Sequence, residues 1–157
     1  MTSTTRRTTV RRATIDDLDA VVPLFDGYRQ FYAQPSDHGT ARAFLSARLQ
    51  RDESVVLLAH LDDGTAAGFT QLYPTFSSVR AARVWVLNDL YVDVGARGHG
   101  VARALLRSAE DFARGDGAIR LELETTPDNA TAQALYDATG WQPYDETLRY
   151  HLPLTRG

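Results

Sequence analysis

The chain has 157 residues, of which 43% are hydrophobic and 24% charged, and its formal net charge is −3. This length and composition fit one globular domain over residues 1–157, with residues 1–6 flexible, and argue against disordered, collagen-like and coiled-coil classes. The weak negative charge argues against a nucleic-acid partner, and the absence of cysteine excludes disulfides and thiolate catalysis.

The first half of the chain predicts one strand, two helices and a β-hairpin. Thr14 is a favourable N-cap ahead of apolar residues at helical spacing, and the sequence Asp-Asp-Gly-Thr at 62–65 is a hairpin signal. The arginines near the start indicate a solvated edge strand. In chain order we expect a strand over 8–13, helices over 14–34 and 37–51, strands over 54–61 and 66–73, and a Pro-Ser loop over 74–78.

The second half predicts a β-α-β unit followed by a helix and two short strands. A long run that is apolar on both faces, as in a strand buried on both sides, precedes a helix with one apolar stripe. Right-handed crossover rules make the strands of this unit parallel. The expected elements are a strand over 82–94, a helix from 101 to about 114, a strand over 119–124, a helix over 129–139, and strands over 141–144 and 147–152.

The strongest chemical signal is the glycine-rich turn between the buried strand and the third helix, Arg97-Gly98-His99-Gly100-Val101-Ala102. Glycines allow close backbone approach, and the free N–H groups and dipole of the following helix favour phosphate. A Walker loop is excluded because no lysine follows. A dinucleotide fingerprint fails because Arg103 occupies the third glycine position and three strands precede the turn. A glycine turn without a ligand remains the structural alternative.

At this turn the sequence resembles the GNAT superfamily of N-acetyltransferases, whose acyl-CoA signature is Arg/Gln-x-x-Gly-x-Gly/Ala. The resemblance covers nearly the whole chain and includes the stretch Leu87–Val92, the stretch Asn129–Tyr136, and Gly140-Trp141. It implies an α/β GNAT fold: a mixed central sheet of about six to seven strands, flanked by four helices, with the parallel fourth and fifth strands splayed around the cofactor.

The resemblance also implies a role for each matching residue, with acetyl-CoA as the co-substrate. The turn amides would bind the pyrophosphate, and the strand before the turn would pair with the pantetheine, which Asn129 also contacts. Tyr136 matches the tyrosine that protonates the departing thiolate, although its spacing alone fits a core tyrosine. The cofactor-binding residues expected on this basis are Tyr91, Val92, Val94, Arg97, Gly98, His99, Gly100, Val101, Ala102, Asn129 and Tyr136.

Asn88-Asp89 interrupts an otherwise apolar strand, and a buried polar group needs a reason. Asp89 is the candidate base that removes the proton of the amine, directly or through water; a structural hydrogen-bond acceptor is the alternative. Relatives that acetylate polyamines carry Glu-Asp here, so Asn88 argues against a two-carboxylate polyamine site.

Aromatic residues dominate the first helix and the loop after the third strand, where the acceptor would bind. Aromatic rings can hold a cation or an apolar group, and Phe31 is expected to be a core residue instead. The candidate acceptor-binding residues are Tyr28, Tyr32, Tyr73, Phe76, Asn88 and Asp89. The stretch Phe69–Ser78 also resembles a subgroup related to a yeast histone and polyamine acetyltransferase, which implies a homodimer through the C-terminal strands.

Three functions stay open at this point. The first is an acetyl-CoA-dependent N-acetyltransferase acting on a primary amine (a small amine, a polyamine or a protein lysine); the others are a non-catalytic acyl-CoA-binding sensor or partner module and a nucleotide-dependent enzyme. The histidines lack metal-binding spacing, and we find neither a signal peptide nor an apolar run of membrane length. We therefore expect no metal, no membrane association and a cytoplasmic location.

Overall fold

The computed structural model describes residues 6–156, which form two compact units divided after Glu124. The first unit holds five strands, three α-helices and two short 3-10 helices. In chain order its elements are β1 (Thr8–Arg12), η1 (Ile15–Asp17), α1 (Leu18–Phe31), α2 (His38–Gln50), β2 (Val55–Leu61), β3 (Ala66–Ser77), β4 (Ala82–Val92), η2 (Val94–Ala96), α3 (Val101–Gly115) and β5 (Arg120–Glu122).

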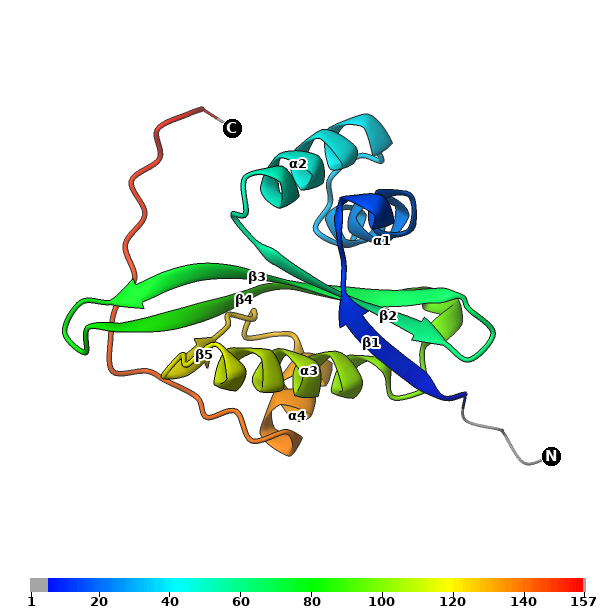
Figure 1. The fold of residues 1–157 in the computed structure, drawn as a ribbon. Helices are drawn as coiled ribbons and strands as arrows, with labels where there is room; N and C mark the ends of the chain where they lie inside the picture. The colour runs from blue at the N-terminus through cyan, green and yellow to red at the C-terminus, as the bar shows by residue number, and fades with distance from the viewer. Residues whose placement is uncertain (1–5, 157) are drawn as a thin grey trace. The chain divides into compact units, whose positions relative to one another are not determined.

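The five strands form one open sheet in the order β1-β2-β3-β4-β5 (Figure 1). The first four are antiparallel neighbours, and β5 runs parallel to β4 as the β-α-β pattern predicted. β1 is an edge strand with Arg11 and Arg12 exposed, which confirms the interpretation of the early arginines. None of the described helices is long and apolar enough to cross a membrane.

Helices cover both faces of this sheet: α1 and α2 lie on one side and α3 on the other (Figure 1). Between the α1–α2 layer and the sheet is a core that includes Val21, Leu45, Leu58 and Phe69. The buried residues of α3 form the single stripe expected from its sequence. Because both faces are covered, β2 is an almost continuous apolar run rather than an alternating one.

Local capping explains where α1 and α2 begin. Thr14 and Asp17 form a capping box at η1, and Arg11 holds the Asp17 carboxylate with two hydrogen bonds of 2.6 and 2.9 Å. Asp37 caps α2 by accepting the backbone N–H of Thr40 at 3.0 Å. The first helix, expected from residue 14, begins as η1 at Ile15 and continues as α1 from Leu18; the second, expected from residue 37, begins at His38.

A β-bulge interrupts the pairing of β3 with β4 next to the polar Asn88-Asp89 pair. Gln71 is opposite Asp89 and Leu72 is opposite Leu87, so Asn88 is the extra residue. β4 and β5 pair only as far as Val86 and Glu122, whereas β4 continues to Val92. The predicted splay of the parallel strands is therefore present, and it leaves the second half of β4 unpaired on its β5 side.

The structure differs from the sequence-based expectations for this unit most clearly at Pro74 and at Phe31. The strand before Pro74 does not end there but continues to Ser77, because β3 beyond Leu72 pairs with β4 alone and a proline without an N–H is tolerated on such an edge. Phe31, expected in the core, is 65% exposed because it is the last residue of α1 and points away from the sheet-facing stripe.

The second unit contains one described helix, α4 (Ala130–Ala138), close to the range 129–139 expected from the sequence, and Asn129 is its N-cap. The strands expected over 141–144 and 147–152 are not formed, and residues 142–156 are exposed. A strand depends on a neighbouring strand for its hydrogen bonds, and residues 125–156 contain none. The sheet therefore has five strands among the described residues instead of six to seven. Residues 1–5, expected to be flexible, lie outside the described chain.

Candidate functional site

The glycine-rich turn begins where β4 ends and continues into α3. Asp93 accepts the N–H of Gly95 at 3.2 Å and so holds η2, while Gly98 and Gly100 adopt left-handed φ angles of +84° and +74°. These angles favour glycine and bring successive backbone N–H groups to the start of α3. His99 is held by the segment that precedes β1, since its Nδ1 accepts the Arg6 N–H at 3.2 Å.

The beginning of α3 suits an anion better than the beginnings of the other helices do. Gly100 provides no capping side chain, and no acid is present in the first turn. The first turn of a helix leaves its N–H groups without intrahelical acceptors, and the first backbone bond here is from the Ala104 N–H to the Gly100 carbonyl, at 3.1 Å. Arg97 and Arg103 flank these N–H groups. The turn therefore has the donors and the charge that a diphosphate requires.

Residues of β4 lead into this turn from the splayed part of the sheet. The Tyr91 side chain is directed toward α1, where a Cβ on Gly27 would come within 2.6 Å of its hydroxyl. Gly27 thus allows α1 to approach β4 closely. Because the Tyr91 side chain faces α1, the groups that a ligand could bind on the unpaired edge of β4 are the backbone N–H and C=O of Tyr91 and Val92. Val94 in η2 is 68% exposed.

Asp89 is the central acid of the buried half of β4. Its side chain is 1% exposed, and its carboxylate accepts hydrogen bonds from Gln71 Nε2 at 2.6 Å and Asn88 Nδ2 at 2.8 Å. Gln71 is itself held by the Ser54 hydroxyl at 2.9 Å. Burial raises the pKa of Asp89, and the two amide donors only partly oppose that shift. A buried carboxylate held by amides rather than by a cation is suited to accept a proton.

A cavity of about 360 Å³ opens over this acid, between α1, α2 and the strands β3 and β4. Four of the residues predicted to bind the acceptor line it: Tyr28, Tyr73, Asn88 and Asp89. Tyr28 also donates to the backbone carbonyl of Asn88, the bulge residue, at 3.2 Å. Burial, together with the charge of Asp89, raises the pKa of both tyrosines, so their hydroxyls stay protonated donors.

Two predicted acceptor residues do not line the cavity. Tyr32 packs edge-on against Tyr28 and is 53% exposed, and Phe76 lies under the Arg83 guanidinium and is 68% exposed. Sequence reasoning missed four residues that do line it: Phe25, Arg29, Thr40 and Phe44. The two phenylalanines followed the helical apolar pattern and stack on one another, but nothing in that pattern distinguishes a cavity wall from a core.

Asn129 and Tyr136, the other predicted site residues, belong to the second unit. The side-chain oxygen of Asn129 accepts the N–H of Ala132 at 3.2 Å and so caps α4. The Tyr136 ring lies 6.0 Å from the ring of Trp141. Asn129 is the N-cap of this short helix, and Tyr136 lies within it about two turns further along.

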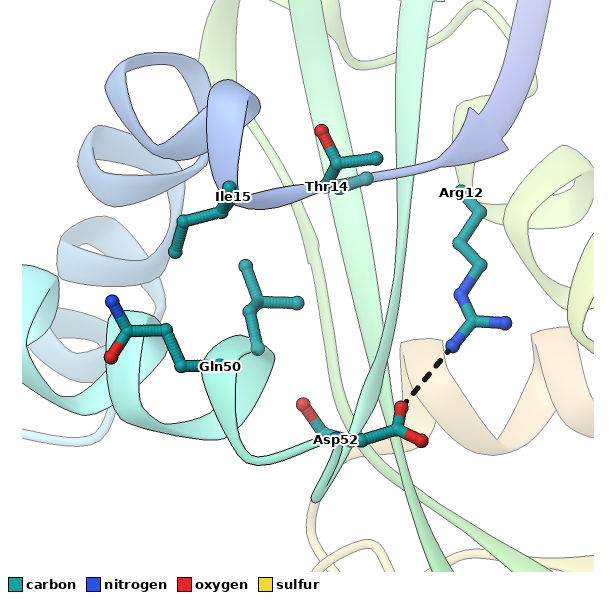
Figure 2. Close-up of a pocket in the computed structure, with 8 residues that line it drawn as sticks. Arg12, Thr14, Ile15, Gln50 and Asp52 are labelled. Carbon is teal, nitrogen blue, oxygen red and sulfur yellow. Dashed lines mark ion pairs between the residues drawn. The ribbon is translucent and has the colours of Figure 1, made fainter.

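A second cavity, of about 420 Å³, contains none of the predicted site residues. It is lined by the connection between β1 and α1 and by the end of α2 (Figure 2). Its charged groups are paired, with Arg12 and Asp52 3.8 Å apart. Among the described residues, no cluster of three or more His, Asp or Glu side chains could hold a metal.

Comparison with known proteins agrees with this geometry. Residues 21–141 match the acetyltransferase (GNAT) family. The chain is 47% identical over 143 residues to the uncharacterized N-acetyltransferase YhfO of Bacillus subtilis, covering 91% of this chain and 95% of that protein. A crystal structure of a probable acetyltransferase has 42% identity and a TM-score of 0.90, over 95% of this chain and 99% of that one.

A more distant structure shares the fold at lower identity. Aminoglycoside N-acetyltransferase AAC(6')-Iy in complex with CoA has 21% identity and a TM-score of 0.76, over 97% of this chain and 99% of that chain.

Proposed function

Because the chain belongs to the GNAT acetyltransferase family, whose members use acetyl-CoA, we propose that it transfers the acetyl group directly to a primary amine. The observation that carries this proposal is the position of Asp89. It is a buried carboxylate in the wall of a small cavity, on the strand that leads into the glycine-rich turn.

The diphosphate of acetyl-CoA is proposed to bind the backbone N–H groups from Arg97 to Ala102. Support comes from the uncapped, acid-free start of α3 and from the left-handed glycines. The pantetheine would then lie along the unpaired edge of β4, near Tyr91, Val92 and Val94, in the manner of an added strand. Asn129 is the proposed second contact for the pantetheine.

The reaction requires a neutral amine, because an ammonium group has no lone pair. Asp89 is proposed to take the proton of the ammonium, directly or through one water molecule, since its raised pKa makes it a better proton acceptor than an exposed aspartate. The amine nitrogen then attacks the thioester carbonyl, the carbon–sulfur bond breaks, and Tyr136 supplies the proton that converts the thiolate to free CoA thiol. The products are an N-acetyl amide and CoA.

Two further parts of the proposal concern the protein as a whole. We propose a homodimer in which the C-terminal segment contacts a second copy, because Leu148, Tyr150, Leu152 and Leu154 are exposed at strand spacing. We propose a cytoplasmic location, where acetyl-CoA is available.

The decisive experiment measures free thiol after the protein is mixed with acetyl-CoA and a panel of primary amines. We expect thiol release that depends on the amine, together with a mass increase of one acetyl group on that amine. Tight CoA binding without thiol release from any amine would instead support a non-catalytic CoA-binding module.

A further inference from the structure

We propose that the acceptor carries a carboxylate as well as its amine, and that Arg29 in the wall of the Asp89 cavity binds this carboxylate. The inference deepens the proposed function and rests on it. It names the chemical class of the acceptor: an amino acid or a similar small zwitterion with an apolar body.

The first observation is that Arg29 lacks a partner where it should have one. Among residues 6–156, its Nη1 is the one buried side-chain nitrogen or oxygen that has no hydrogen-bond partner. No carboxylate of the described residues lies within ion-pair distance of this guanidinium, whereas Arg11 of β1 and Arg42 and Arg48 of α2 each have such a partner. A guanidinium nitrogen that is removed from water needs an acceptor, and leaving it without one costs stability.

The second observation is that the nearby acids are already occupied. Asp37, whose pKa is lowered mainly by Thr40 and in small part by the charge of Arg29, accepts the Thr40 N–H and hydroxyl at 3.0 and 2.7 Å. The carboxylate of Asp89 accepts two amide donors. The protein therefore leaves a donor nitrogen unsatisfied on an arginine that lines the cavity.

The third observation is that the charges of the cavity have opposite signs and that its walls are aromatic. Arg29 and Asp89 line the same space of about 360 Å³, together with Phe25, Tyr28, Phe44 and Tyr73. This volume is in the range of small-molecule sites. An amine near Asp89 and a carboxylate at Arg29 would satisfy both charges, and the rings would contact an apolar body. A polyamine, which has only cationic groups, would bring a second positive charge to Arg29.

The test compares acceptors that differ only in the carboxylate. For phenylalanine, phenylalaninamide and phenethylamine, and for a series of ω-amino acids of increasing length, we would measure kcat/KM by thiol release. We would also measure binding to the protein by calorimetry without acetyl-CoA. We expect at least one carboxylate-bearing acceptor to exceed its amide by about tenfold or more in both measurements.

Variants of Arg29 connect this preference to its side chain. Arg29→Gln should abolish the ratio between acid and amide while leaving the affinity for CoA unchanged, and Arg29→Lys should keep part of the ratio. The matched control is Arg42→Gln, since Arg42 is an arginine of the adjacent helix that is already paired with Asp19 and does not line the cavity. That variant should keep the full ratio.

The outcomes separate the two proposals. If amines release thiol but the amide or the decarboxylated amine is preferred, or if Arg29→Gln keeps the ratio, the carboxylate inference is overturned and the acetyltransferase proposal stands. If no acceptor of any class releases thiol, both fall.

Discussion

Asp89 is buried among amide groups rather than beside a cation, and this determines how it ionises. Burial favours the neutral carboxyl, while Gln71 and Asn88 donate to the charged form. The raised pKa means that the ionised form costs folding stability as the pH rises through it, a sign typical of a functional rather than a structural acid. Gln71, whose side chain donates to Asp89 and accepts from Ser54, is then a positioning residue.

Replacing Gln71 with Leu should move the acid limb of the kcat/KM profile to higher pH. Loss of the Nε2 donor removes a group that stabilises the carboxylate, so the pKa of Asp89 rises further and activity falls earlier as the medium is acidified. Asp89→Asn should instead remove the acid limb of this pH profile and lower the plateau value of kcat/KM about a hundredfold. A Gln71→Leu profile that is lower but not displaced would reduce Gln71 to a structural role.

Tyr136 is the proposed proton donor to the leaving thiolate. Tyr136→Phe should lower kcat by about tenfold or more, with little change in the dissociation constant of CoA, because the ring is kept and only the acid is lost. Stopped-flow thiol detection and calorimetry with CoA would measure the two quantities. If Tyr136→Phe and the parent protein turn over the same acceptor equally fast, Tyr136 is not the proton donor to the thiolate.

At the scale of elements, the join between β4 and α3 is organised around left-handed glycines. Built on Gly100, a Cβ meets no atom within 4 Å, so the position has space and its constraint is the backbone angle. Aspartate and asparagine both tolerate this angle better than most residues. The two substitutions therefore differ mainly in charge.

Gly100→Asp should weaken CoA binding by about tenfold or more, whereas Gly100→Asn should weaken it only slightly, because a carboxylate repels the diphosphate. Calorimetry at low and high salt measures both, and the difference between the variants should shrink at high salt. Equal affinity of the two variants would mean that the diphosphate does not lie at this turn.

A buried carboxylate of α1, Asp26, holds the connection between α1 and α2. Asp26 is 1% exposed and accepts hydrogen bonds at 2.7 Å from Gln30 Nε2, the Ser36 hydroxyl and the Asp37 N–H. Burial by itself would raise the pKa of Asp26, but these donors outweigh it and lower the pKa. The ionised carboxylate therefore holds the connection from which the α2 cap starts.

Asp26→Ala should lower the free energy of unfolding at pH 7 by about 3 kcal/mol, since three donors lose a charged acceptor. Because the folded-state pKa is lowered, this stabilisation is present above the unfolded pKa and is lost as the pH falls through the folded one. Urea titrations at several pH values should show the two proteins converging in acid. Asp19→Ala, an exposed pair member on the same helix, should leave the midpoint nearly unchanged.

At the scale of the whole molecule, the C-terminal segment exposes apolar side chains that the single chain does not cover. Its apolar side chains recur at every second position from Leu148 to Leu154, yet residues 125–156 contain no strand to pair with them. Exposed rows of this kind are usually covered by another surface.

Light scattering after size-exclusion chromatography should give twice the 17.4 kDa chain mass. Leu152→Glu should reduce it toward the monomer by placing a charge on the apolar row, while His151→Glu, on the alternate face, should not. A wild-type protein that is monomeric at micromolar concentration would contradict the proposed dimer.

Local sequence was sufficient for much of this protein. The order of the helices and of the first five strands, the parallel β-α-β unit, the cap at Thr14 and the glycine turn all depend on residues close together in the chain. The same is true of Asp89, which local pattern marked as a polar residue in an apolar strand. The prediction of strands over 141–144 and 147–152 was wrong. Alternating apolar residues favour a strand, but a strand also needs a neighbouring strand for its hydrogen bonds.

Only the tertiary structure shows which residues surround Asp89. Gln71 lies 18 residues away in the chain and Tyr28 lies 60 residues from Asn88, and both meet at the bulge because β3 pairs with β4 beneath α1. In the sequence, nothing distinguishes Arg29 from other polar residues of the predicted first helix. Its significance depends on burial and on the absence of a nearby acceptor, and these are properties of packed three-dimensional space rather than of spacing along the chain.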